Sequence, residues 1–298
     1  MVQFQVLAWD SRDEEDKHVI TMFGRTADGK SVSLSTPFKP YFFCKVPPGK
    51  IPPDVVPKSL RRSTHYKDLW GFQNGKKHPF FHYEFPTLEA WRRGKSITRN
   101  KGMLHYEANI DPVLRFMHRS GIKSTGWVTT DDAKCYRSST THTDIRLWCG
   151  DWTELAPIDR DDNAPLKIAS IDIETYSSTG AFPDPLVPDD VCFQIAVTWE
   201  TLGNPESRES VCLCWPNTTK PRGSKGWTLR SYDTEKEVLE AFSALVRKED
   251  FDVLTGWNIY GFDLNYMAVR AKKVGAHSFW DLGRFRDDPS ELVTKKLS

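Results

Sequence analysis

Apolar and polar positions alternate in short runs through the first half of the chain. Such runs predict strands at residues 4–9, 19–23 and 31–34. Asp28 and Gly29 stand between the last two runs, a pair that favours a tight hairpin. Apolar residues then recur at helical spacing over residues 111–120, and Gly121 supplies a stop signal. The first half is therefore predicted to be β-rich with one clear helix.

In the second half, predicted strands alternate with predicted helices. Thr234 and Glu237 form a capping box ahead of an apolar stripe, and a further helix begins at Phe262 and ends before Gly275. This order predicts the α/β (α+β) class, with a mixed sheet flanked by helices. The strands are expected at residues 167–174, 191–198, 210–215 and 251–254.

A polar, acidic and proline-bearing stretch at residues 153–165 separates the halves. We therefore expect two domains, residues 1–155 and 156–298, which suits a chain of 298 residues. Net charge is only +1, yet residues 1–150 carry 24 Lys and Arg against 15 Asp and Glu. Residues 151–298 carry 17 against 25. A basic front half suits a phosphate-bearing partner and an acidic back half suits a metal site, although unevenly spread surface charge would look the same.

The cysteines and the hydropathy indicate in which cellular compartment the protein is found. The six cysteines are scattered without the spacing of zinc ligands. No apolar run approaches the ~18 residues of a membrane span, and the chain opens on a strand-like segment in place of a signal peptide. We expect an intracellular protein with no membrane contact.

Two carboxylates stand on one predicted strand. Side chains alternate faces along a strand, so Asp172 and Glu174 share a face with Ser170. Their Cα atoms would lie about 6.5 Å apart, close enough for both carboxylates to reach one cation. By itself this spacing is a weak signal, since an acidic, solvent-facing strand end is commoner than a metal site.

Asp263 adds a third carboxylate at the expected first turn of a helix. A helix cap would also explain it. However, Asn258 and Phe262 precede it in a combination that no cap requires: Asn258 offers a donor and an acceptor to a phosphate or sugar, and Phe262 is either core or a surface for a terminal base. Clustered carboxylates suit a pair of hard divalent cations that cut a phosphodiester.

Basic and aromatic residues interleave over residues 58–101. Cations beside stacking platforms are how single strands are held without sequence preference. The alternative is that Phe80, Tyr83 and Phe85 pack the core of the domain. We expect mixed use, with aromatic residues in the core and four basic residues available to template phosphates: Lys76, Lys77, Arg92 and Arg93.

The segments 169–174 and 256–263 resemble the first and second exonuclease motifs of the family B DNA polymerases. The resemblance is to the delta-type enzymes of eukaryotes and their large-virus relatives. It extends to residues 38–43, 106–117 and 180–196, in the family's order. It implies a 3′→5′ proofreading exonuclease domain of ribonuclease H-like fold, behind a β-rich N-terminal domain with an OB-like part.

The resemblance also implies residue roles. Asp172 would bridge two Mg²⁺ ions, Glu174 would hold the ion that activates water, and Asp263 would hold the other, with Mn²⁺ as an alternative metal. Thr175 joins Asn258 and Phe262 as a predicted substrate contact. The implied partners are DNA, as single-stranded template and 3′ end, and a sliding clamp or accessory subunit. The implied location is the nucleus or a viral replication site.

One family feature is missing. The third exonuclease motif, Tyr-x-x-x-Asp, does not occur after Asp263, and the polymerising palm, fingers and thumb would lie further on. We expect the N-terminal portion of a larger replicative polymerase, or one chain of a split polymerase, with little exonuclease activity alone. The alternatives are a non-catalytic ribonuclease H-like scaffold that binds nucleic acid, and a free-standing exonuclease, which would need a complete site. The three carboxylates favour an enzyme over a scaffold.

Overall fold

The computed structural model describes residues 1–45, 61–69, 74–131, 135–138, 140–223 and 225–293. The chain divides into two compact units. The first holds Met1–Gly24, Val32–Arg137 and Leu147–Asp161, and the second holds Arg25–Ser31, Ser138–Arg146 and Asp162–Ser298. The domain boundary at residue 155 stays a prediction. The units change over at Asp161, and the second unit also takes in two short segments from the front half.

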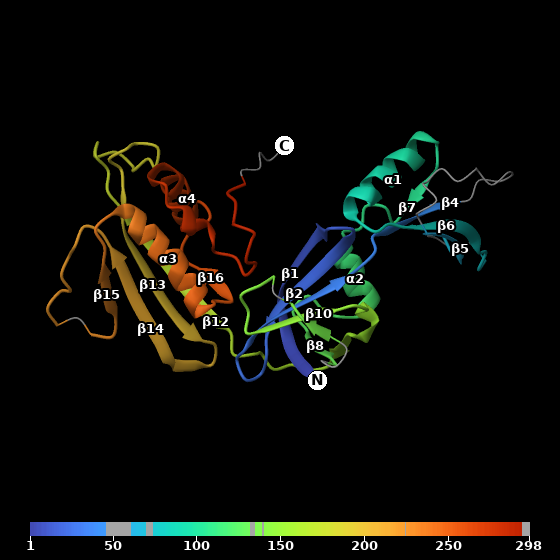
Figure 1. Ribbon diagram of the computed structural model, residues 1–298, viewed down its shortest axis with the longest axis horizontal. Coiled ribbons are helices and arrows are strands. Elements are labelled where there is room, and N and C mark those ends of the chain that lie inside the picture. Colours follow the sequence, from blue (N-terminus) through green and yellow to red (C-terminus); the bar gives the residue numbers. More distant parts are fainter. Residues whose placement is uncertain (46–60, 70–73, 132–134, 139, 224, 294–298) are drawn as a thin grey trace. The chain divides into compact units, whose positions relative to one another are not determined.

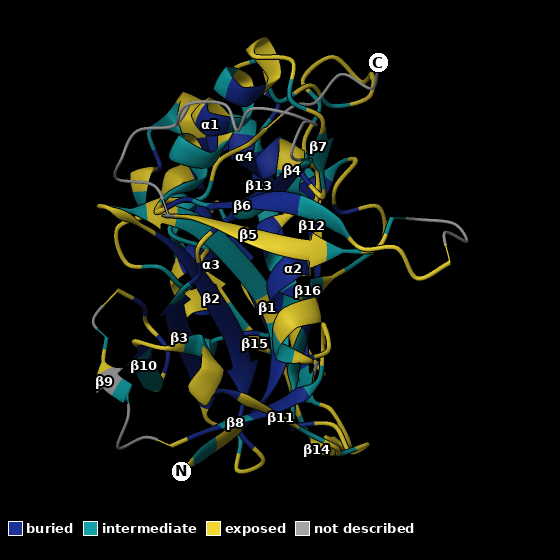
Figure 2. Cartoon of the chain, turned by 90° about the vertical axis from the view of Figure 1, so that its right-hand side faces the viewer, coloured by how far each residue is buried: buried dark blue, intermediate teal, exposed yellow. Residues whose placement is uncertain are grey.

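A seven-stranded sheet dominates the first half, in the order β11-β8-β1-β2-β3-β10-β9. It contains the three strands predicted from alternation, and β2 is buried along almost its whole length (Figure 2). Gly29, in the predicted hairpin, has φ +85°, a conformation that favours glycine. The strands are β1 (Val2–Glu14), β2 (Lys17–Arg25), β3 (Ser31–Pro37), β8 (Trp127–Thr130), β9 (Cys135–Arg137), β10 (Ile145–Cys149) and β11 (Ala156–Ile158).

The first unit also contains a four-stranded sheet in the order β5-β6-β4-β7. Phe80, Tyr83 and Phe85 are at most 2% exposed, which confirms that these aromatic residues serve the core. The edge strand β5 is exposed from Arg62 to Tyr66 (Figure 2). The strands are β4 (Tyr41–Lys45), β5 (Arg61–Lys67), β6 (His78–Glu84) and β7 (His105–Tyr106).

Two helices complete the first unit. The predicted one, α2 (Pro112–Ser120), begins at Asp111, whose carboxylate accepts from the Val113 N–H at 2.8 Å, and ends at Gly121. The other, α1 (Leu88–Asn100), was not predicted. Its buried residues are Gly94 and Thr98, so it lacks the apolar stripe that marks a surface helix.

The second unit is built on a five-stranded mixed sheet in the order β15-β14-β13-β12-β16 (Figure 1). β12 pairs antiparallel with β13 but parallel with β16, and β14 pairs parallel with β15. The predicted α/β class with a mixed sheet is therefore confirmed. The strands are β12 (Lys167–Thr175), β13 (Cys192–Thr201), β14 (Asn204–Cys214), β15 (Thr228–Ser231) and β16 (Val253–Thr255).

Two helices of the second unit follow the sequence prediction closely. α3 (Glu235–Glu249) starts with the predicted capping box of Thr234 and Glu237 and packs on β13 and β14 (Figure 1). α4 (Asp263–Val274) ends at Gly275 in the left-handed conformation. Among the described residues, no helix combines the length and the apolar character that crossing a membrane requires.

Candidate active site

β12 carries the first two predicted carboxylates. Along this strand Ile171 and Ile173 are buried in the core of the second unit, while Asp172 and Glu174 are exposed. The predicted alternation of faces is therefore correct. The two acidic side chains face water because their apolar neighbours face the helices.

Loop 256–262 lies close to β12 because residue 256 is a glycine. β16 runs parallel to β12 with Thr255 opposite Ser170, so the chain leaves β16 close to Asp172. A Cβ atom on Gly256 would lie 2.5 Å from the carbonyl oxygen of Ile171, closer than real Cβ contacts allow. Only glycine permits this approach. Sequence reasoning gave Gly256 no such role, and no local pattern marks it.

Asp263 is brought directly against β12. It is the first residue of α4 and is only 3% exposed. Its Oδ1 accepts a hydrogen bond from the backbone N–H of Ile173 at 3.2 Å. Burial raises the pKa of the Asp263 carboxyl, and the negative charge of Asp172 raises it further. Two of the three predicted carboxylates therefore interact.

This repulsion predicts that Asp172→Asn stabilises the metal-free protein. A raised folded-state pKa means that stability is lost as pH rises through that pKa, because ionising Asp263 costs more in the folded than in the unfolded state. Removing the charge of Asp172 lessens this loss. In EDTA, we expect urea unfolding to show Asp172→Asn more stable than wild type at pH 7, with the difference vanishing well below the ordinary Asp pKa.

The neighbouring Ser170→Ala serves as the control, since Ser170 lies on the same exposed face and carries no charge. It should leave the pH dependence of unfolding unchanged. Identical pH profiles for wild type and Asp172→Asn would show that Asp172 does not act on Asp263.

Asn258 occupies a strained turn beside these carboxylates. Its φ is +53°, and its carbonyl oxygen accepts from the N–H groups of Gly261 and Phe262 at 2.9 and 3.0 Å. A Cβ atom on Gly261 would come within 2.3 Å of Asn258 Oδ1, so a side chain at this position would displace the Asn258 amide. Thr175, the other predicted polar contact, ends β12 where the pairing with β13 shifts register.

Phe262 takes the first of the two roles considered for it, packing against the core, and its role as a surface for a terminal base stays a prediction. It is partly buried against the core and contacts Tyr266, with ring centroids 5.3 Å apart. On its other side it contacts Phe182, also at 5.3 Å, and Phe182 is 79% exposed. Sequence reasoning had not singled out Phe182. The sequence could have indicated Phe182, because a large aromatic residue stands there in a Gly- and Pro-bearing segment that cannot bury it.

Buried polar groups anchor the loop that carries Phe182. The carboxylate of Asp190 accepts from the N–H groups of Ser178 and Asp184 at 2.8 and 2.9 Å, and these and the Ser178 hydroxyl lower its pKa. From α4, Arg270 donates to the carbonyl of Val187 at 2.9 Å and forms an ion pair with Glu235 at 2.5 Å. The loop is therefore tied to both helices behind the sheet.

The donor set fits a hard divalent cation in its chemistry, since all three candidates are carboxylates. In the described structure, however, the side chains of Asp172, Glu174 and Asp263 are not close enough together to hold one metal ion. Within the described residues, no three His, Cys, Asp or Glu side chains come together closely enough to hold one metal ion. The ligand set Asp172, Glu174 and Asp263 therefore stays a prediction.

The basic residues predicted to contact template phosphates lie on the first unit. Lys77 pairs with Asp68 at 2.7 Å and Arg93 pairs with Glu89 at 2.8 Å, whereas Lys76 and Arg92 are exposed. Part of this basic and aromatic stretch, residues 58–60 and 70–73, lies outside the described residues. Its role in DNA binding stays a prediction.

The family model for the exonuclease domain of DNA polymerase family B matches residues 103–297. The chain belongs to DNA polymerase family B. The predicted family is therefore confirmed, and the match covers β12, α4 and the loop between β16 and α4.

Named relatives agree with this family. The DNA polymerase of Paramecium bursaria Chlorella virus NY2A is 30% identical over 286 residues, which cover 88% of this chain and 30% of the relative. The DNA polymerase delta catalytic subunit of Schizosaccharomyces pombe is 26% identical and covers 96% of this chain. This family B chain spans less than a third of the length of either relative.

A solved structure shares the fold. The family B DNA polymerase of the hyperthermophilic archaeon Pyrobaculum calidifontis matches 92% of this chain and 33% of its own, with a TM-score of 0.66. At 21% sequence identity this likeness concerns the fold alone.

Proposed function

We propose that this family B chain forms the 3′→5′ exonuclease region of a replicative DNA polymerase. The observation that carries the proposal is the docking of Asp263 against β12, where its carboxylate is close enough to Asp172 to raise its own pKa. A buried acid held close to a second negative charge costs stability in a metal-free protein. Binding of cations would remove that cost, which is a reason for a functional site to keep both acids.

Asp172, Glu174 and Asp263 would hold the metal ions, Mg²⁺ or alternatively Mn²⁺. When bound, a metal pair supplies an activated water and offsets the charge on the leaving 3′-oxygen. The chain's own residues orient the DNA. Asn258, exposed and fixed in its turn, offers its amide to a phosphate or sugar, and Thr175 offers a hydroxyl from the end of β12.

Phe182 and Phe262 would together receive the terminal bases of a single-stranded 3′ end. Phe262 is anchored in the core and supports Phe182, whose ring is largely exposed. Bases stack on exposed aromatic rings without sequence preference. A proofreading site needs such tolerance, because any base can be the mispaired one.

DNA synthesis would belong to the rest of the polymerase, in the same chain or in a second one. Further partners would be template DNA, through Lys76, Lys77, Arg92 and Arg93, and a sliding clamp or accessory subunit. We expect the 298-residue chain alone to bind Mg²⁺ weakly and to show little exonuclease activity. The family resemblance implies a fourth carboxylate in a Tyr-x-x-x-Asp motif that does not follow Asp263 here.

The metal site is tested by titrating the chain with Mn²⁺ and measuring binding by electron paramagnetic resonance. We expect Asp172→Asn and Asp263→Asn each to weaken Mn²⁺ binding about tenfold, because each removes a charged oxygen ligand. Ser170→Ala should bind as wild type does. DNA affinity measured without metal should change in none of these variants.

Unchanged Mn²⁺ binding in Asp172→Asn would contradict the proposal and favour the non-catalytic scaffold. Digestion of a 3′-labelled single strand in Mg²⁺ gives a second test. Robust digestion by this chain alone, abolished by Asp172→Ala, would support the nuclease but show that the site is complete without a fourth carboxylate.

A further inference from the structure

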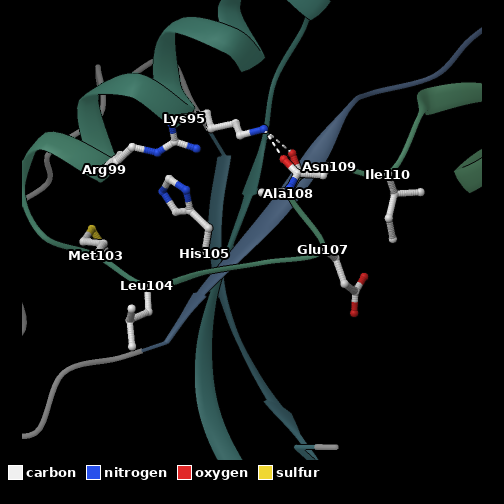
Figure 3. Close-up of a pocket in the computed structure, with 9 residues that line it drawn as sticks. All are labelled: Lys95, Arg99, Met103, Leu104, His105, Glu107, Ala108, Asn109 and Ile110. Atoms are coloured by element: carbon white, nitrogen blue, oxygen red, sulfur yellow. Dashed lines mark hydrogen bonds between the residues drawn. The ribbon is translucent and has the colours of Figure 1, made fainter. Parts of the chain in front are cut away.

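The first unit contains a cavity of about 540 Å³ between α1 and the segment that leads through β7 (Figure 3). Its volume falls within the range of small-molecule sites. The helix contributes Lys95 and Arg99, and the segment contributes His105 and Asn109. None of these residues belongs to the proposed exonuclease site.

Two cations point into this cavity. Lys95 Nζ donates to the carbonyl of Ala108 and to Asn109 Oδ1, both at 2.6 Å, and lies 4.8 Å from the centroid of the Trp91 ring. In the described part of the chain its charge has no carboxylate partner. Arg99 makes no ion pair or side-chain hydrogen bond with any part of the chain that the structure describes. Its planar fork of donors matches two oxygens of one phosphate.

Among the lining residues that the structure describes, no carboxylate pairs with Lys95 or Arg99. Glu107 is the one acidic residue there, and its two oxygens are held by Lys67 at 2.5 Å and Arg115 at 2.8 Å. Figure 3 shows its carboxylate pointing away from Lys95 and Arg99. Burial and the positive charge of Arg99 lower the pKa of both Lys95 and His105. The cavity is therefore electropositive and suited to an anion.

The remaining wall is apolar and open. Met103 lines it, and Leu104 and Ile110 are 64% and 39% exposed. An inorganic anion would use the two cations but leave this wall in water. A ligand that joins a phosphate to a base and a sugar would use both parts.

We propose that this cavity binds a nucleotide, with Arg99 and Lys95 on the phosphate and the Met103–Leu104 wall on the base. The nucleotide is either a free molecule or one unit of a single strand. Asn109 adds a further donor beside the phosphate, since its amide nitrogen can donate while its oxygen is held by Lys95.

The test uses the 298-residue chain and three variants: Arg99→Ala, Lys95→Met and the control Lys123→Ala. Arg99 and Lys123 are both exposed cations of the first unit, but Lys123 lies outside the cavity lining. Binding of dTMP is followed by the NMR signals of the His105 ring. Binding of a ten-residue fluorescent oligo-dT is followed by anisotropy.

We expect dTMP to shift the His105 signals, and Arg99→Ala and Lys95→Met each to weaken dTMP binding by about tenfold. Lys123→Ala should bind dTMP as wild type does. A parallel loss of oligo-dT affinity identifies the ligand as a unit of a strand, and an unchanged oligo-dT affinity identifies a free nucleotide.

Three results would overturn the inference. They are an absence of His105 shifts with dTMP, an equal loss in Arg99→Ala and Lys123→Ala, and inorganic phosphate that binds as tightly as dTMP. Circular dichroism checks the fold of each variant. Because Asp172→Asn leaves this cavity unchanged, failure here and failure of the exonuclease proposal are distinguishable.

Discussion

Replacing Asp252 by alanine is expected to destabilise the second unit by about 3–5 kcal/mol. The Asp252 side chain is completely buried and bridges two arginines. One oxygen accepts from Arg25 Nε at 2.6 Å and from the Lys167 N–H at 2.8 Å, and the other accepts from Arg284 at 2.7 Å. Truncation leaves two guanidinium groups facing each other, with Asp250 as the remaining carboxylate partner.

Urea unfolding followed by circular dichroism measures this loss. The control is Asp281→Ala, which removes an ion pair with Arg247 whose side chains are about 40% exposed, and which should cost less than about 1 kcal/mol. Asp252→Asn should lie between the two, because the amide keeps one acceptor. If Asp252→Ala costs no more than Asp281→Ala, then the arginines are satisfied without Asp252.

Replacing Glu235 by alanine is expected to cost a similar amount, about 3–5 kcal/mol, and also to loosen the loop that carries Phe182. Glu235 and Arg270 are 6% and 2% exposed. Glu235 accepts two hydrogen bonds from Arg270, at 2.8 and 2.5 Å, and one from the Cys192 N–H at 2.9 Å. Without it, the hydrogen-bond partners that Arg270 keeps in the described part of the chain are the loop carbonyls.

Hydrogen exchange of residues 178–190 and urea unfolding measure the two effects together. Exchange in this loop should accelerate in Glu235→Ala, because Arg270 holds it through carbonyls at Pro185, Val187 and Pro188. Glu89→Ala, which breaks an exposed pair with Arg93, should leave both measurements nearly unchanged. Stability lost without faster loop exchange would mean that the ion pair does not hold the loop.

A double-mutant cycle separates the interaction energy of the Glu235–Arg270 pair from the contribution of its surroundings. Removing both charges in Glu235→Leu with Arg270→Leu should cost less than the sum of the two single changes, because each single change leaves an unpaired buried charge. Additive losses would show that the two side chains do not stabilise one another.

The sequence predicted elements whose signals are local. Alternation along β12 placed Asp172 and Glu174 on the exposed face, and the capping box at Thr234 marked the start of α3. Both signals need only a few neighbouring residues. α1 has a local start signal in its N-cap Thr87, but it lacks a run of large apolar residues, because it packs Gly94 against the ring of Phe85, where a Cβ atom would clash.

What the sequence determined by itself was the family, the strand faces and most helix ends, since motif spacing and periodicity operate over a few residues. Only the tertiary structure decided which distant residues meet. Asp263 contacts Ile173 across 90 positions, Asp252 contacts Arg25 across 227, and Arg99 faces a cavity whose acidic residue, Glu107, is paired with Lys67 and Arg115. Such pairs depend on how strands and helices pack. No local pattern encodes that packing. The family motifs led us to expect Asp172 and Asp263 at one site, but the hydrogen bond from Ile173 that positions Asp263 had to be seen in the fold.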